Sequence, residues 1–330
     1  MIKFTLFRLL QVIPTLFAVS LIAFFIIQLP PGDYLTVHIA NLQSQGETVD
    51  PAQIEALRQR YGIDDPFWVQ YWKWISNILF HGDFGQSFQH GRPVSVLIGD
   101  VLSLTVILGV ATLLLTWAIA LPAGVISAMR QHTGVDYAIS GIGFVALAVP
   151  NFLVALIFAY LGFALLGTSV GGLFSPEYAH APWSFGKVID LLEHLWIPVL
   201  VISLAGTAGI IRITRANMLD ELRKPYVTTA RAKGLSEAKI IRKYPLRIAL
   251  NPFISTVGWN IPNIFDGEVI VATVLALGTT GPLLLGALQA QDMYLAGGII
   301  LIIAVLTVIG TLISDILLAA VDPRVRYGRI

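Results

Sequence analysis

The sequence predicts an all-α membrane protein with six transmembrane helices, and three observations lead to this prediction. Of the 330 residues, 56% are apolar and only 12% are charged, whereas soluble domains carry about 25% charged residues. Six apolar segments reach about the 20 residues that a helix needs to cross a bilayer. Lys and Arg gather in alternate connecting segments. The predicted spans are Leu9–Leu29, Leu102–Ile126, Tyr137–Leu166, Leu195–Ile213, Pro252–Leu277 and Leu295–Val321.

The start of the chain resembles a signal peptide, because Lys3 and Arg8 precede the apolar run of the first predicted span. Its apolar run of 21 residues is longer than the roughly 7–15 residues of a signal sequence. No Ala-x-Ala cleavage site follows it. We therefore expect an uncleaved transmembrane helix rather than a cleaved signal.

The third predicted span contains Pro150. Proline removes one backbone hydrogen bond from a helix and kinks it. No polar turn separates the residues on its two sides, so we expect one tilted or kinked span over 137–166. Two helices joined at Pro150 are the alternative.

The orientation of the chain follows from its basic residues. Sixteen of the 21 Lys and Arg residues lie in the N-terminus, the 127–136 loop, the 212–250 segment and the C-terminus, and five lie in the other connections. Because cytoplasmic loops carry the excess of Lys and Arg, both termini and the 212–250 segment are expected in the cytoplasm. The segment 30–101 is then extracytoplasmic.

Two outer segments carry structural signals. Residues 67–75 form an aromatic-rich amphipathic run, and Trp and Tyr favour the membrane interface. We expect this run to lie as a helix on the outer leaflet, or to contact an outer partner. The segment from Gly167 to Trp196 is rich in Gly, Ser, Pro and aromatic residues and is expected to form a partly structured cap.

The basic segment 225–246 is punctuated like a pair of short helices. Pro225 suits the first turn of a helix, and Gly234 suits a left-handed C-terminal cap. Ser236 can then cap a second helix, which Pro245 ends. The preference of cytoplasmic loops for Lys and Arg explains why this segment is basic. It does not explain the order of the proline, glycine and serine residues. We therefore predict a rigid helix–glycine–helix unit that docks a partner.

Several motifs resemble those of one transporter family. Thr228-Thr229-Ala230, followed after three residues by Gly234, is similar to the Glu-Ala-Ala-x3-Gly signature of type I ABC importer permeases, with threonines at the first two positions. The resemblance is to the dipeptide/oligopeptide branch and covers the whole chain in order. The other matching stretches are Arg8-Leu9-Leu10 with Ile13-Pro14, Pro31-Gly32-Asp33, Tyr61–Pro66, Gly82–Ser87, Arg92-Pro93-Val94 and Asp322–Arg326.

The resemblance implies a type I ABC importer permease fold in a bacterial or archaeal plasma (inner) membrane. Residues 1–101 would form the first helix and an extracytoplasmic segment, and residues 102–330 a five-helix core with a cytoplasmic coupling loop over 214–250. The contact with the ATPase would comprise Thr228, Thr229, Ala230, Arg231, Ala232, Lys233, Gly234 and Leu235.

The implied partners are a second homologous permease, two cytoplasmic ATPase subunits and an extracytoplasmic substrate-binding protein. This chain has no Gly-x4-Gly-Lys-Ser/Thr motif for nucleotide, so ATP and Mg would bind to the ATPase subunits. The chain itself would hold no cofactor and catalyse no reaction. Its net charge of +1 gives no indication of a nucleic-acid partner.

Polar residues inside predicted spans are candidates for the translocation path, since charged groups in a bilayer face a cavity or a partner. They are Asn151, Asn260, Asn263, Asp266 and Glu268. Asp266 and Glu268 lie about 200° apart around a helix. We therefore expect Glu268 to line the path and Asp266 to meet the second permease. Ala272 stands where the family has a glutamate, and Gly278-Thr279 where it has Pro-Gly.

Two other classes of protein stay open. A secondary transporter would need an ion-coupling site and, usually, inverted repeats. An intramembrane enzyme would need a nucleophile–base pair or a metal set, and none stands out: there is no cysteine, and the six histidines lack metal-ligand spacing. Within the importer class, peptides are the expected substrate, and oligosaccharides, opines and nickel chelates are the alternatives.

Overall fold

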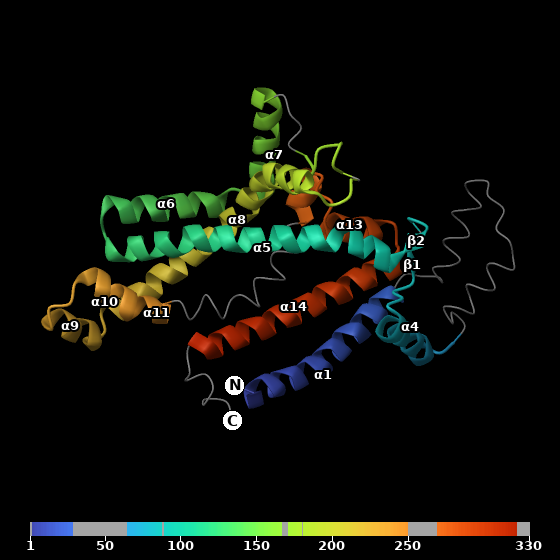
Figure 1. The fold of residues 1–330 in the computed structure, drawn as a ribbon, viewed down its shortest axis with the longest axis horizontal. Coiled ribbons are helices and arrows are strands. Elements are labelled where there is room, and N and C mark those ends of the chain that lie inside the picture. The colour runs from blue at the N-terminus through green and yellow to red at the C-terminus, as the bar shows by residue number, and fades with distance from the viewer. Residues whose placement is uncertain are drawn as a thin grey trace. The chain divides into compact units, whose positions relative to one another are not determined.

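The structure is a computed structural model that describes residues 2–28, 65–87, 89–166, 171–179, 181–249 and 269–321. Helices dominate these residues (Figure 1). The chain divides into two compact units. One comprises Met1–Thr5, Leu104–Gly278 and Ile309–Ile330, and the other comprises Leu6–Ser103 and Thr279–Val308. Two long helices, α5 (Val94–Met129) and α14 (Met293–Val321), contribute residues to both units.

The unit of residues 6–103 and 279–308 is built on an aromatic core. It holds α1 (Ile2–Ile27), α4 (Phe67–His81), α13 (Thr280–Gln289) and an antiparallel pair, β1 (Gln86–Ser87) and β2 (Arg92–Pro93). The Phe24 ring lies 5.6 Å from that of Tyr71 and 5.5 Å from that of Trp74, so α4 packs on α1 through aromatic contacts.

The β1–β2 turn is fixed to the start of α14 by a buried carboxylate. Asp292 is 2% exposed and accepts hydrogen bonds from the Ser87 hydroxyl at 2.6 Å and from the Gln89 amide at 3.2 Å. It also accepts one from the Leu295 amide at 3.3 Å, within the first turn of α14. A carboxylate at a helix N-terminus satisfies amides that have no partner in the helix, so this residue anchors the turn.

The other unit holds the bent helices. It contains α6 (Gly134–Ala148), α7 (Asn151–Leu161), a π-helical turn η1 (Gly162–Leu166) and α8 (Phe185–Leu222). Both α6 and α7 pack against α8. The segment ends in three short helices, α9 (Pro225–Ala232), α10 (Glu237–Lys243) and α11 (Pro245–Ala249). Its largest buried cluster includes Leu108, Val201 and Leu275.

Among the described residues, three helices are long and apolar enough to cross a membrane, or five spans if two bent helix pairs are each counted as one. The three are parts of α1, α5 and α14, and the bent pairs are α6 with α7 and the two halves of α8. The predicted fifth span lies mostly outside the described residues. The count of six therefore stays a prediction, while the apolar, all-α class is confirmed.

The segment predicted as one span over 137–166 is broken at Pro150, as in the alternative of two joined helices, and its crossing of the membrane as a single span stays a prediction. α6 and α7 are separate helices that meet at 93° around Val149 and Pro150, which Figure 1 shows as α7 standing away from α6. Val149 has an extended backbone, with φ −91° and ψ 123°. A residue before proline is driven out of the helical region by contact with the proline ring, so the break needs no polar turn.

The aromatic run forms a helix, as predicted, and α4 extends it to His81. Its position on the outer leaflet stays a prediction. The segment 167–196 is less irregular than expected, because α8 begins at Phe185. Ser184 accepts a hydrogen bond from the Lys187 amide and so starts that helix.

Candidate coupling surface

The first helix of the basic segment begins and ends where the sequence indicates. Pro225 is at the first turn of α9, where its missing N–H has no intrahelical partner to lose. The helix ends in a Schellman turn. The Gly234 amide donates to the Arg231 carbonyl at 2.9 Å, and the Leu235 amide donates to the Ala230 carbonyl at 3.3 Å.

Gly234 makes this turn possible, because its φ of +76° is in the left-handed region. A Cβ at this position would have no heavy atom within 4 Å. The requirement for glycine is therefore conformational and not steric. The predicted left-handed cap is confirmed in the structure.

α9 and α10 are held together by a small apolar core of their own. Val227 and Ile240 are fully buried and Ala230 is 5% exposed. Tyr226, Leu235 and Tyr244 pack around these three residues. Burying a Val or Ile side chain contributes about 1.5–3 kcal/mol, so the two helices form one rigid unit. We call residues Pro225–Lys243 the helix-pair unit.

Two polar contacts further stabilise this unit. Arg231 on α9 makes a bidentate ion pair with Glu237 at the start of α10, at 2.6 and 3.2 Å. This exposed guanidinium lowers the pKa of Glu237 by hydrogen bonding, and the carboxylate raises the pKa of Arg231. The Tyr226 hydroxyl donates to the Glu221 carboxylate at the end of α8, at 2.5 Å. Burial and this carboxylate raise the pKa of Tyr226.

The outer face of α9 is open. Thr228, Thr229, Ala232 and Lys233 are exposed, as are Arg231 and Gly234. Ala230 lies inside the unit and Leu235 is half-buried beside it. The residues predicted to contact an ATPase thus divide into an exposed face and two residues that support it. Ser236 occupies the N-cap position of α10, but its side chain forms no cap hydrogen bond.

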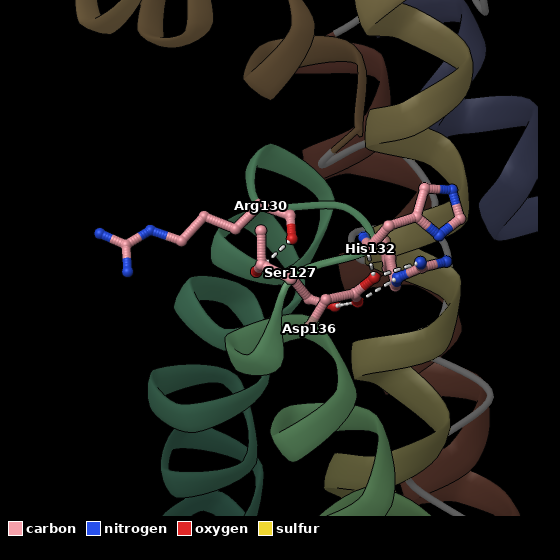
Figure 2. Close-up of polar contacts among 6 residues, drawn as sticks. Ser127, Arg130, His132 and Asp136 are labelled. Carbon is pink, nitrogen blue, oxygen red and sulfur yellow. Dashed lines mark hydrogen bonds and ion pairs between the residues drawn. The ribbon is translucent and has the colours of Figure 1, made fainter.

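A buried ion pair ties α8 to the turn between α5 and α6. Asp136, 2% exposed, accepts hydrogen bonds from Arg215 Nε at 2.8 Å and Nη2 at 2.7 Å. The Ser127 hydroxyl and the His132 amide also donate to this carboxylate (Figure 2). Three segments of the chain therefore meet at one carboxylate, which we call the Asp136 cluster.

Close backbone packing supports the same junction. A Cβ on Gly124 of α5 would lie 2.6 Å from Thr214 Cβ and 3.0 Å from the Ile211 carbonyl oxygen of α8. Only glycine allows this approach. Sequence reasoning missed both this contact and the Asp136 cluster. The available signal was Arg215 just beyond the apolar part of a predicted span, where a charge needs a partner.

The predicted path residues are not assembled into a site in the described part of the chain. Asn151 lies half-buried in the first turn of α7. Asn260, Asn263, Asp266 and Glu268 lie outside the described residues. Their place in a translocation path stays a prediction.

Comparison with known proteins identifies two matching family models. One is described as "binding-protein-dependent transport system inner membrane component" and matches residues 120–327. The other, for the N-terminal part of such membrane components, matches residues 1–109.

Similar proteins match almost end to end. The oligopeptide transport system permease protein AppB of Bacillus subtilis is 37% identical over 97% of this chain and 98% of its own length. The permease protein OppB of the Escherichia coli K12 oligopeptide system is 32% identical over 99% of this chain and 100% of its own. A solved structure of the MetNI methionine ABC transporter, in inward-facing conformations, aligns with a TM-score of 0.52 at 15% identity, covering 68% of this chain and 96% of that chain. This likeness shows a shared fold.

Proposed function

The chain belongs to the family of inner membrane components of binding-protein-dependent transport systems, and from this premise we propose that it couples ATP hydrolysis on a partner subunit to the import of peptides. The observation that carries the proposal is the helix-pair unit. It is a pair of short helices with an exposed face on α9, held in one orientation by a Schellman turn, an apolar core and an ion pair. A rigid projection of this kind suits the transmission of force.

The proposed path of that force follows the contacts in order. An ATPase subunit would bind the exposed face of α9 at Thr228, Thr229, Ala232 and Lys233. Movement of α9 would pass through the Tyr226–Glu221 hydrogen bond to the end of α8. From α8 it would pass through the Asp136 cluster to the α5–α6 turn. Because each of these contacts is a hydrogen bond or an ion pair, α5, α6 and α8 would move together with the exposed face of α9.

Peptides are the proposed substrate because two relatives aligned over nearly the full chain are named oligopeptide permeases. Oligosaccharides, opines and nickel chelates are the alternatives. Asn151, Asn260, Asn263 and Glu268 are the proposed path residues, and Asp266, the remaining candidate, is proposed to meet the second permease. Glu268→Gln is expected to reduce transport without dissociating the complex.

The proposed assembly contains this chain, a second and different permease, two cytoplasmic ATPase subunits and an outer substrate-binding protein. ATP and Mg would bind to the ATPase subunits, and this chain would hold no cofactor and catalyse no reaction. Both termini and the coupling loop over 214–250 are proposed to be cytoplasmic, with residues 102–330 as the permease core. The unequal distribution of Lys and Arg supports this orientation.

The test is uptake of a labelled peptide library by vesicles that contain the purified complex. Uptake should require ATP on the side of the helix-pair unit and the binding protein on the other side. Uptake that persists with an inactive ATPase but responds to an ion gradient would instead indicate a secondary transporter. Uptake of a sugar or a nickel chelate in preference to peptides would correct the substrate and leave the ATP-driven mechanism in place.

A further inference from the structure

A second surface of the basic segment has a different chemical character from the face of α9. On α10 and α11, an open hollow is lined by Ser236, Ala238, Lys239, Arg242, Lys243 and Arg247. All four cationic side chains are exposed. Lys239 is three residues before Arg242 and four before Lys243, so these three share one side of α10. The lining offers hydrogen-bond donors from two ammonium groups, two guanidinium groups and one hydroxyl.

No carboxylate in the described part of the chain balances this positive charge. Within the described residues, no carboxylate forms an ion pair with Lys239, Arg242 or Arg247, and Lys243 lies 5.4 Å from the ring of its neighbour Tyr244. Between residues 233 and 249 there is one acidic side chain, Glu237, and Arg231 already occupies it. Four like charges around one hollow repel one another unless an anion joins them.

The position of the hollow along the chain favours a membrane anion. Arg247 stands five residues before Pro252, where the fifth span is predicted to begin. Five extended residues reach at most about 18 Å, so the predicted span would place α11 near the headgroup layer. Ile248, next to Arg247, exposes 45% of its surface and can contact an acyl chain.

We propose that this hollow is a binding site for the phosphate headgroup of an anionic phospholipid in the cytoplasmic leaflet. The guanidinium groups of Arg242 and Arg247 can each bind two phosphate oxygens, while Lys239 and Lys243 add point charges. Anionic lipids gather at the cytoplasmic surface, and each nearby Lys or Arg adds to the attraction. The lipid would hold α10 and α11 near the membrane surface and so help to orient the helix-pair unit as a whole.

The experiment compares two double variants of the full-length chain in its complex. Lys239→Gln with Arg242→Gln removes two charges from the hollow. Arg223→Gln with Lys224→Gln removes two exposed charges just before α9, outside the hollow. Each complex is titrated with phosphatidylglycerol and with phosphatidylcholine, and bound lipid is counted by native mass spectrometry. ATPase subunits that copurify are counted in the same spectra.

We expect the hollow variant to bind phosphatidylglycerol on the order of tenfold more weakly, with unchanged phosphatidylcholine binding and a full set of ATPase subunits. The control variant should bind both lipids as the unmodified complex does. Equal loss in the two variants, or none in either, would overturn the proposal. Loss of ATPase subunits without loss of lipid would assign the hollow to the ATPase instead. Inorganic phosphate that saturates the hollow without displacing phosphatidylglycerol would also contradict it.

Discussion

At the scale of single residues, Gly234 and Asp136 have the clearest physical roles. Gly234 adopts a backbone conformation that costs other residues free energy, with φ +76° and open space around its Cβ position. Asp136 gathers four donor contacts on one buried carboxylate. Gly234 sets the direction of the turn after α9, and Asp136 joins α8 to the turn between α5 and α6.

The variant Gly234→Val should weaken coupling. A β-branched residue in the left-handed region costs about 1–3 kcal/mol, so α10 should be displaced relative to α9. We expect fewer ATPase subunits to copurify and less stimulated ATP hydrolysis in vesicles. Gly234→Asn is the matched control, because Asn tolerates the same conformation. If both variants couple normally, the Schellman turn does not position the surface.

The Asp136–Arg215 pair should show a coupling energy of about 1–3 kcal/mol in a double-mutant cycle with Asp136→Asn and Arg215→Gln. Removing either partner leaves the other unpaired, while removing both leaves no unpaired charge. Thermal unfolding of the four proteins in detergent measures this. Arg130→Gln is the control, since the Arg130 side chain is in the same turn but points away from the carboxylate (Figure 2). Additive effects of the two substitutions would mean that the pair contributes no net stability.

At the scale of elements, local sequence signals predict the geometry of the helix-pair unit, whereas they do not indicate long-range contacts. Pro225 and Gly234 act within one turn of the chain, so α9 and its cap follow from the sequence. Asp136 and Arg215 are 79 residues apart, and no local pattern indicates that they meet. Pro150 predicts a kink, and the structure has a 93° bend, because the extended backbone of Val149 adds to the loss of one hydrogen bond.

The break at Pro150 gives the third prediction. The substitution Pro150→Ala restores an N–H and releases Val149 into the helical region, so α6 and α7 should straighten. Spin labels on cysteines at Ile142 and Tyr160, 71% and 70% exposed, would report the change by pulsed EPR. At a right-angle bend their backbone separation is about 19 Å, and in one straight helix it is about 27 Å. An unchanged distance would show that packing on α8 imposes the bend.

At the scale of the whole molecule, this is a membrane protein whose two faces are predicted to differ in charge and in function. The described part of the chain contains long apolar helices. The sequence matches models of a binding-protein-dependent transport family over residues 1–109 and 120–327. Sixteen basic residues on one predicted side and five on the other predict the orientation. The coupling surface and the basic hollow both belong to the more basic side.

This orientation predicts opposite labelling of two positions. The chain has no cysteine, so His81→Cys and Ala238→Cys, both at exposed positions, can be labelled one at a time. In sealed right-side-out vesicles, an impermeant maleimide should react with the His81→Cys variant. It should react with the Ala238→Cys variant only after the vesicles are permeabilised. Reaction of both from one side would mean that the number of spans between them is even and the topology is wrong.

Binding of the ATPase to the exposed face of α9 can be tested by crosslinking from Thr228→Cys in the purified complex. A short bifunctional reagent should join this residue to an ATPase subunit, with a yield that changes between the ATP-bound and nucleotide-free states. Phe80→Cys, at a side chain 78% exposed on α4, should not crosslink to that subunit. A complex with active ATPase in which Thr228→Cys crosslinks only to lipid or to nothing, or in which Phe80→Cys captures the ATPase, would contradict the account.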